Sequence, residues 1–281
     1  MKITSQHSIG TWNFSMGLIL TAFMAIGSVS YSTQANAEEM MVDPEKILKA
    51  EGVYGVFATY KVRSDYSMVS MADREKAAAE VDDLVKKHSK SVLVQAYLTR
   101  GFESESDILL RLHAYEPANA QAFLVDFKAT TFGRHTDVTE TLVGVTKALN
   151  HTTKEKSPNL LEALKGTPYS GGEPKYAFMI PIKKDAAWWN LSENEKLILM
   201  EEHTVPTLPY LVNVKRKLYH STGIDDTDFI TYFETNDLVA FNNLNIALHS
   251  VKEMLHNTRY GSPIVLGTIH SVKDVISAVS K

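Results

Sequence analysis

The sequence predicts an α+β fold of two ferredoxin-like units, each with the element order β-α-β-β-α-β. Two observations carry this prediction: this order occurs twice along the chain, and a segment rich in proline and glycine separates the two copies. Two such units can bring their sheets together, so we expect a dimeric αβ-barrel-like subunit. The expected organisation is an N-terminal domain over 38–153, a linker over 154–175 and a C-terminal domain over 176–281.

The first copy follows a short N-terminal region of the predicted mature chain. Strands are expected where β-branched and aromatic residues concentrate, and helices where apolar residues recur three or four positions apart. Pro117 opens the second helix, at a position where its missing N–H removes no hydrogen bond. The expected elements are strand 53–62, helix 72–88, strand 91–98, strand 107–115, helix 117–129 and strand 138–148.

The second copy repeats this order directly after the linker. Ser192 and Glu195 have the spacing of a capping box, which starts the first helix of this copy. Pro206 and Pro209 are expected to end or kink that helix beyond His203. The expected elements are strand 176–182, a helix from 192, strand 212–220, strand 228–234, helix 236–255, strand 262–269 and helix 271–279.

The N-terminus has the features of an export signal over residues 1–37. Lys2 precedes an apolar run at 16–26, and an A-x-A cleavage site ends at Ala37. The apolar run is short for a bilayer span. We therefore expect cleavage after Ala37 and a periplasmic mature protein that makes no membrane contact; the alternative is an uncleaved anchor.

The composition restricts the chemistry of this chain. It has 281 residues and a formal net charge of -4, which becomes -5 when cleavage removes the signal with its single charged residue, Lys2. This charge argues against nucleic acid as a partner, and a small anionic substrate would need a local cation to attract it. The chain has no cysteine, which excludes disulfides, thiolate metal ligands and covalent attachment of haem through C-x-x-C-H.

Two cations stand out against apolar strand patterns. Arg216 shares a strand face with Val214 and Leu218, where a buried guanidinium is unfavourable unless it is paired or binds an anion. Lys184 ends the apolar stripe of the strand that opens the second copy. The alternative for both is a long side chain that reaches solvent from the end of its strand.

His203 and Glu253 are both expected on helices. His203 borders an apolar flank, and its imidazole could ligate haem iron; the alternative is an ordinary core or surface histidine. Glu253 is in register with the apolar residues Val239 and Ile246. It could accept the other N–H of a ligating histidine, with Lys184 balancing its charge; the alternative is a carboxylate on a helix surface.

Trp188 and Trp189 stand between a strand and a helix. They could cover an edge of the core or form a wall for a flat macrocycle, with indole N–H groups available to propionates. A histidine on a helix, followed thirteen residues later by an arginine on a strand, can place a metal ligand and a cation on opposite sides of such a cofactor. This pattern points to haem chemistry on a small anion.

Taken together, these residues resemble the chlorite dismutase family of haem b proteins. The resemblance is close over residues 176–271 and is one of topology in the first half. The WW pair and the VKRKLYHSTG run resemble the long, exported, two-domain members with chlorite-decomposing activity. The segments that carry the resemblance are WWN at 188–190, EEHT at 201–204, YLVNVKRKLYHSTG at 210–223, DDTDFITYFET at 225–235, VKE at 251–253 and GSPIVLGTIHS at 261–271.

The resemblance implies an enzyme with one haem b per subunit that decomposes chlorite to chloride and dioxygen, forming an O–O bond. His203 would be the axial ligand of the haem iron, Glu253 would accept its other N–H, and Lys184 would bond to Glu253. Arg216 would be the catalytic cation on the distal side. The family most often assembles as a homopentamer in its long forms. The other cofactor-binding residues would be Trp188, Trp189, Asn150, Leu218, Thr231 and Phe233.

Other interpretations of the same residues stay open. A related haem protein could decarboxylate a porphyrin or act as a weak peroxidase, but such porphyrin-processing relatives are usually cytoplasmic and lack the distal arginine. The export signal and Arg216 argue against this alternative. An exported haem-binding or haem-sensing protein without chlorite turnover is the second alternative, and the charge of Arg216 disfavours it. A barrel without a cofactor is the third, and His203 with Glu253 argues against it.

Overall fold

The structure is a computed structural model that describes residues 42–148 and 155–281. The predicted export signal over 1–37 and the predicted propionate contact Asn150 lie outside the described residues. Among the residues described, no helix combines the length and the hydrophobicity that crossing a bilayer requires.

The described residues form nine strands in one antiparallel sheet that closes on itself. The strands follow the order β7-β6-β4-β1-β3-β2-β9-β5-β8, and β7 pairs with β5 as well as with β6. This additional pairing closes the sheet into a barrel, with β8 alongside the end of β5. The predicted α+β barrel of two ferredoxin-like units is therefore confirmed. The strands are β1 Tyr54–Val62, β2 Leu93–Leu98, β3 Ile108–Ala114, β4 Thr136–Val145, β5 Tyr176–Lys184, β6 Val214–His220, β7 Phe229–Thr235, β8 Asn257–Tyr260 and β9 Val265–His270.

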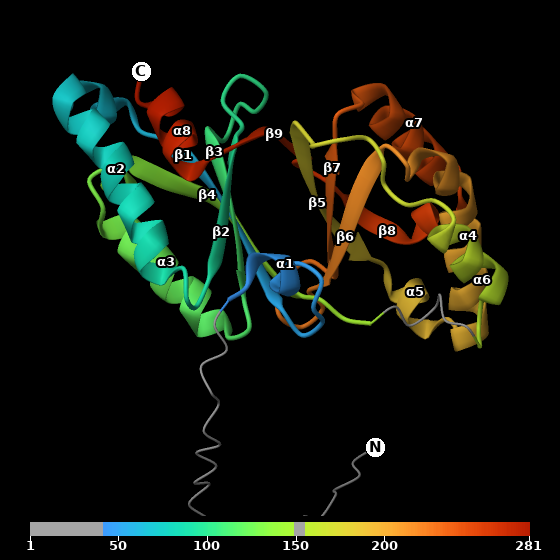
Figure 1. Cartoon of the computed structure of the whole chain (residues 1–281). Coiled ribbons are helices and arrows are strands. Elements are labelled where there is room, and N and C mark those ends of the chain that lie inside the picture. The colour runs from blue at the N-terminus through green and yellow to red at the C-terminus, as the bar shows by residue number, and fades with distance from the viewer. Residues whose placement is uncertain (1–41, 149–154) are drawn as a thin grey trace, which may run out of the picture. The chain divides into compact units, whose positions relative to one another are not determined.

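Helices α2, α3 and α8 cover the outside of the first half of the barrel (Figure 1). α8 follows the second copy in the sequence, yet its buried Val275 and Ile276 belong to the core of the first half. The C-terminal helix therefore ties the two halves together. The helices of this half are α1 Pro44–Ile47, η1 Ser64–Met68, α2 Met71–His88, α3 Pro117–Ala129, η2 Gly133–His135 and α8 Val272–Val279.

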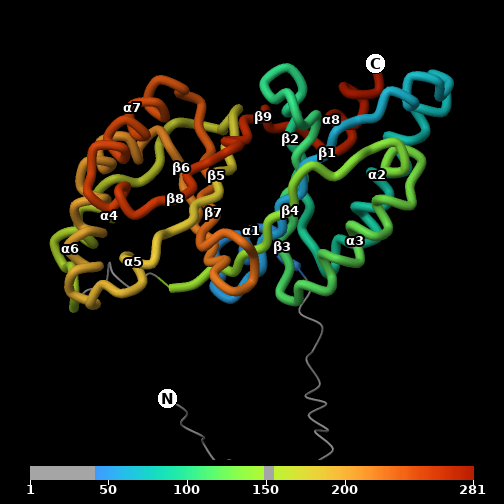
Figure 2. Tube along the Cα trace, turned by 180° about the vertical axis from the view of Figure 1, so that it is seen from behind, coloured from blue at the N-terminus to red at the C-terminus, as the bar shows by residue number. Residues whose placement is uncertain are grey.

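A second group of helices lies on the outer side of the other half, as the view from behind also shows (Figure 2). Ser192 and Glu195 form the predicted capping box at the start of α6. α6 gives way to the 3-10 helix η3 just before Pro206, as the two prolines predicted. The helices of this half are α4 Pro158–Lys165, α5 Ala186–Asn190, α6 Glu193–Thr204, η3 Val205–Tyr210, α7 Leu238–His249 and η4 Lys252–His256.

A polar network fills part of the barrel interior between the halves. Arg111 Nη2 on β3 donates to the Tyr219 hydroxyl over 2.7 Å, and His113 Nε2 lies 2.7 Å from the same oxygen. The Arg111 guanidinium also lies 3.5 Å from the centre of the Tyr232 ring and 3.5 Å from Glu234 Oε1. Because Tyr219 is on β6 and Glu234 is on β7, this network fixes the two strands that carry the predicted distal residues.

The long helix predicted over 236–255 is wrong at its C-terminal end. The chain leaves α7 before Val251, whose backbone is extended (φ -100°, ψ 153°), and Glu253 lies on the separate helix η4. Val239 and Ile246, which defined the predicted apolar stripe, are 69% and 57% exposed. Glu253 is nevertheless buried, because η4 turns it inward after the helix has ended.

Two further segments differ from their predicted structure. The strand predicted over 262–269 begins later, at Val265, and β8 before it was not predicted. The predicted linker contains α4, which begins with Pro158. Because proline and glycine are abundant in that segment, its sequence did not predict this helix of about two turns.

Candidate active site

A chain of three buried or half-buried polar side chains links α6, η4 and β5. His203 lies in the last turn of α6, and its Nδ1 is 2.9 Å from Glu253 Oε2. The other carboxylate oxygen, Glu253 Oε1, forms an ion pair with Lys184 Nζ at the end of β5. The exposed fractions of the three side chains are 24%, 6% and 3% for His203, Glu253 and Lys184. The predicted order histidine–carboxylate–lysine is thus present in the folded chain.

Local backbone geometry places Lys184 in this chain. The pairing of β5 with β8 shifts register between Lys183 and Lys184, and the Lys184 N–H donates to Asp228 Oδ2 over 2.8 Å. The Lys184 ammonium lies 4.4 Å from the centre of the Trp188 ring, within the range of a cation–π contact. The alternative of a solvated lysine at a strand end is therefore wrong.

The electrostatic surroundings keep His203 neutral. Burial, followed by the positive charges of Lys184 and Arg216, lowers the pKa of His203 to about 4. Burial also lowers the pKa of Lys184 to about 8, and the nearby carboxylates of Asp185 and Asp228 act in the opposite direction. A neutral imidazole whose Nδ1–H donates to a carboxylate leaves Nε2 unprotonated, which is the form that binds a metal.

Arg216 faces the same side of the sheet as the other predicted distal residues. In the register of β6 and β7, Arg216 pairs with Phe233, and Leu218 pairs with Thr231. Paired residues of antiparallel strands share a face, so all four side chains lie on one surface. Phe233 is buried, whereas Leu218 and Thr231 are half-buried.

Arg216 lies on an apolar strand face but is exposed, which is the alternative that the sequence left open for it. Its neighbour on the same face, Val214, is buried at 1% exposure, but the side chain of Arg216 is exposed. The packed core of this half covers Val214 and stops before Arg216. Surrounding protein still lowers the pKa of the guanidinium, as expected for a side chain lining a cleft. Within the described residues, it has no hydrogen bond or ion pair.

The two tryptophans differ in exposure. Trp188 is buried at 4% exposure, and its backbone N–H donates to Asp185 Oδ1 over 2.7 Å. His256 Nδ1 lies 3.1 Å from the same carboxylate oxygen. Trp189 is 44% exposed and stacks on Phe229, with ring centres 6.3 Å apart. Trp188 thus supports the Lys184 ammonium, while Trp189 offers an accessible aromatic face beside β7.

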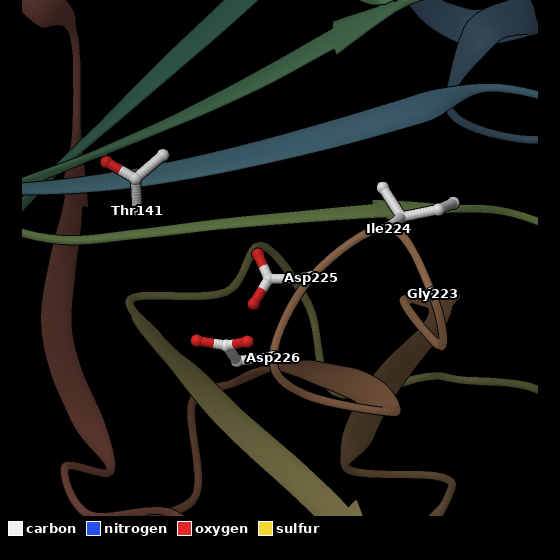
Figure 3. A pocket seen from close by; sticks show the side chains of 5 residues that line it. All are labelled: Thr141, Gly223, Ile224, Asp225 and Asp226. Carbon is white, nitrogen blue, oxygen red and sulfur yellow. The ribbon is translucent and has the colours of Figure 1, made fainter.

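Two hollows lie near these elements. One, of about 490 Å³, opens beside Arg216 between α4 and the start of β6. The other, of about 480 Å³, lies at the turn between β6 and β7, where Figure 3 shows the carboxylates of Asp225 and Asp226 next to each other. Asp225 Oδ2 accepts the Val143 N–H over 2.8 Å, so this carboxylate fastens the turn to β4. Over residues 42–148 and 155–281, no three histidine or carboxylate side chains are grouped as a metal site would need.

The sequence and the fold of this chain match one known family. A family model described as Chlorite dismutase matches residues 74–270. The chain is 58% identical over 239 residues to the chlorite dismutase of Ideonella dechloratans, a match that covers 85% of this chain and 84% of that protein. The chain belongs to the chlorite dismutase family. The resemblance predicted from its motifs is thereby confirmed.

Solved chlorite dismutases have the same architecture. An arginine-to-lysine variant of the enzyme from Candidatus Nitrospira defluvii matches with a TM-score of 0.82 and 42% identity, over 85% of this chain and 100% of that one. The imidazole complex of the same protein matches equally well, with a TM-score of 0.82 and 42% identity over the same shares of the two chains. A haem-binding protein from Thermus thermophilus, 17% identical with a TM-score of 0.66 over 82% of this chain and 96% of that one, shares the fold.

The residues of this chlorite dismutase family member fit the haem on which the family depends. His203 offers a neutral imidazole whose Nδ1 is already engaged by Glu253, so only Nε2 is available to iron. After burial and the charge of Lys184, the positive charge of Arg216 also contributes to the lowered pKa of His203. Haem chemistry on a small anion needs a nitrogen ligand for the iron and a positive charge that attracts the anion, and these residues supply both.

Sequence reasoning missed the residues that support this site. Asp228 holds the backbone of Lys184, Asp185 caps α5 before Trp188, and Phe229 stacks on Trp189. Asp185 had a signal in the sequence, because it stands three residues before Trp188 at the spacing of a helix cap. Asp228 and Phe229 had none, since their partners lie far away along the chain.

Proposed function

We infer that this chain is a haem-dependent chlorite dismutase that converts chlorite to chloride and dioxygen. One observation carries this inference: His203, Glu253 and Lys184 contact one another in turn, and Arg216 has no partner within the described residues. The protein in which they occur is 58% identical to a chlorite dismutase. The atoms balance without a co-reactant, because both oxygens of chlorite leave as dioxygen and chlorine leaves as chloride.

The proposed cofactor is haem b, one per subunit, bound without a covalent link. The chain has no cysteine to form thioether bonds, so axial ligation and packing must hold the group. His203 Nε2 is the proposed axial ligand. When bound, haem supplies a redox-active iron that can accept and return an oxygen atom of the substrate.

Glu253 and Lys184 tune the proposed ligand. A carboxylate that accepts the Nδ1–H fixes the orientation and tautomer of His203 and makes its ring more electron-rich. Lys184 compensates the charge of Glu253 in a site where the two side chains are 3% and 6% exposed. The pair can therefore hold a full carboxylate next to the imidazole without leaving a bare buried charge.

Arg216 is the proposed catalytic cation. A guanidinium stays charged at any physiological pH. Among the described residues, no carboxylate is paired with Arg216, so an incoming anion has no competitor for it. It would attract chlorite and hold the chlorine oxyanion close until the O–O bond forms. Leu218, Thr231 and Phe233 share its face and would restrict the escape of that oxidant.

The remaining proposals concern the cofactor walls, the assembly and the location. Trp188 and Trp189 would line the haem, and Asn150 would approach a propionate. The mature chain would begin at Glu38, after cleavage behind Ala37, and act in the periplasm as a homopentamer. Mass spectrometry and light scattering of the protein exported by its host would test the cleavage site and the subunit number.

Oxygen release tests the function. The mature chain, loaded with haem, is given chlorite in a Clark-type electrode with a hypochlorite trap present, and His203→Ala serves as the control. Rapid release of one dioxygen for each chlorite supports the function. If haem-loaded protein releases no oxygen, the chain is instead an exported haem-binding or peroxidase-like protein of the same fold.

A further inference from the structure

The charge of the whole molecule opposes its proposed substrate. The formal net charge of the chain is -4, so the average field of the protein repels a small anion such as chlorite. A single guanidinium at the reaction centre acts over a short range, because salt screens exposed charges beyond about 10 Å. Fast capture therefore requires further cations along the route to Arg216.

The hollow of about 490 Å³ beside Arg216 provides such a route. Its apolar wall comes from α4, which contributes Leu161 and Leu164, and its opposite wall is the start of β6. Lys165, Lys215 and Arg216 all line this hollow, so three of its nine lining residues carry a positive charge.

The two lysines lie in different environments. Lys165, at the end of α4, is exposed and has no ion pair within the described residues. Lys215 is half-buried: its Nζ lies 4.8 Å from the centre of the Tyr169 ring and 3.9 Å from Glu234 Oε2. Lys215 is therefore held in place, whereas Lys165 can meet an anion in solvent.

We propose that Lys165 and Lys215 form, with Arg216, a cationic approach that draws chlorite into the distal site. Lys165 acts at the exposed end of the hollow, and Lys215 adds a charge next to Arg216 that the Glu234 carboxylate offsets in part. Both are steering residues that act on the rate of anion entry, and the proposal rests on the function proposed above. An apolar wall on α4 strengthens the effect, because low-dielectric surroundings focus the field of nearby charges.

The size of the effect follows from Coulomb's law. One charge acting over about 10 Å in water changes the local concentration of a monovalent anion by about twofold. Neutralising Lys165, which has no ion pair within the described residues, should thus lower the rate of anion entry about twofold at low salt. Neutralising Lys215 should lower it by less, because Glu234 offsets part of its charge, and the double variant should lower it the most. The effect should disappear near 1 M salt, where the screening length falls to about 3 Å.

Ligand association in the haem-loaded protein tests the proposal without turnover. Stopped-flow spectroscopy would follow azide, an anion, and imidazole, which is mostly neutral at about pH 8. The variants are Lys165→Gln, Lys215→Gln, the double variant, and Lys215→Arg, which keeps the charge. Lys273→Gln is the matched control, because it removes an exposed lysine on α8 in the other half.

We expect slower azide association in the three glutamine variants, unchanged imidazole association, and the wild-type azide rate in Lys215→Arg and Lys273→Gln. The value of kcat/KM for chlorite should follow the azide rate, with kcat unchanged. Unchanged azide rates, or azide and imidazole slowed alike, would overturn the proposal. Oxygen release by the wild-type protein is measured separately, so a failure of steering cannot be mistaken for a failure of the function.

Discussion

Replacing Lys184 by methionine would leave the Glu253 carboxylate buried without its cation. The two side chains are 3% and 6% exposed, so solvent screens neither of them. Removing one partner of such a pair typically lowers the free energy of unfolding by about 3–5 kcal/mol, because the remaining charge is buried and uncompensated. We expect a loss in this range for Lys184→Met.

A double-mutant cycle isolates the ion pair from the packing of each side chain. Glu253→Gln removes the charge and keeps an oxygen that can accept the His203 N–H. The double variant should therefore recover most of the stability that Lys184→Met loses, with a coupling free energy of about 2–4 kcal/mol.

Urea unfolding, followed by the fluorescence of Trp188 and Trp189, measures these free energies. The proteins are compared without added haem, because a ligand that binds only the folded state would raise the apparent stability. Lys175→Met, at an exposed lysine just before β5, is the control and should change stability by less than about 0.5 kcal/mol. A loss below about 1 kcal/mol for Lys184→Met, or additive losses in the cycle, would refute the buried ion pair.

The other predictions concern the ligand, the distal cation, the barrel and a helix cap. His203→Ala should lose haem, and a fully loaded protein with an unchanged Soret spectrum would refute the ligand assignment. Arg216→Ala should retain haem but release hypochlorite to a trap and inactivate sooner; unchanged turnover without leakage would refute its role. Arg111→Met should lower the free energy of unfolding by about 3 kcal/mol in urea, because it leaves Glu234 without its buried cation; a loss near zero would show that the network contributes nothing. Ser192→Ala should cost about 1 kcal/mol through its capping box, by the same measurement, and Ser192→Gly should cost less.

Local patterns predicted most of the elements correctly. α3 begins and ends at the predicted residues, Pro117 and Ala129, and the capping box and prolines set both ends of α6. These signals depend on residues a few positions apart, which a single sequence displays. The closure of the barrel through β5 and β7 depends instead on pairing between distant strands, so only the repeated element order hinted at it.

The candidate site was predicted in part for the wrong reason. Glu253 is buried beside His203, but it reaches that position on η4 and not on the long helix from which its burial was argued. The apolar neighbours of Arg216 on its strand left its burial undecided, and it is exposed because the packed core ends before it. Burial depends on what covers a strand, and the strand's own sequence does not contain that information.

The origin of the two oxygen atoms tests the central claim most directly. An equal mixture of chlorite labelled with oxygen-18 at both positions and unlabelled chlorite would be added to the haem-loaded chain in ordinary water. If Arg216 holds the chlorine oxyanion until the O–O bond forms, mass spectrometry should find dioxygen with two labels or none. Dioxygen with one label, from water or from a second chlorite, would contradict the account.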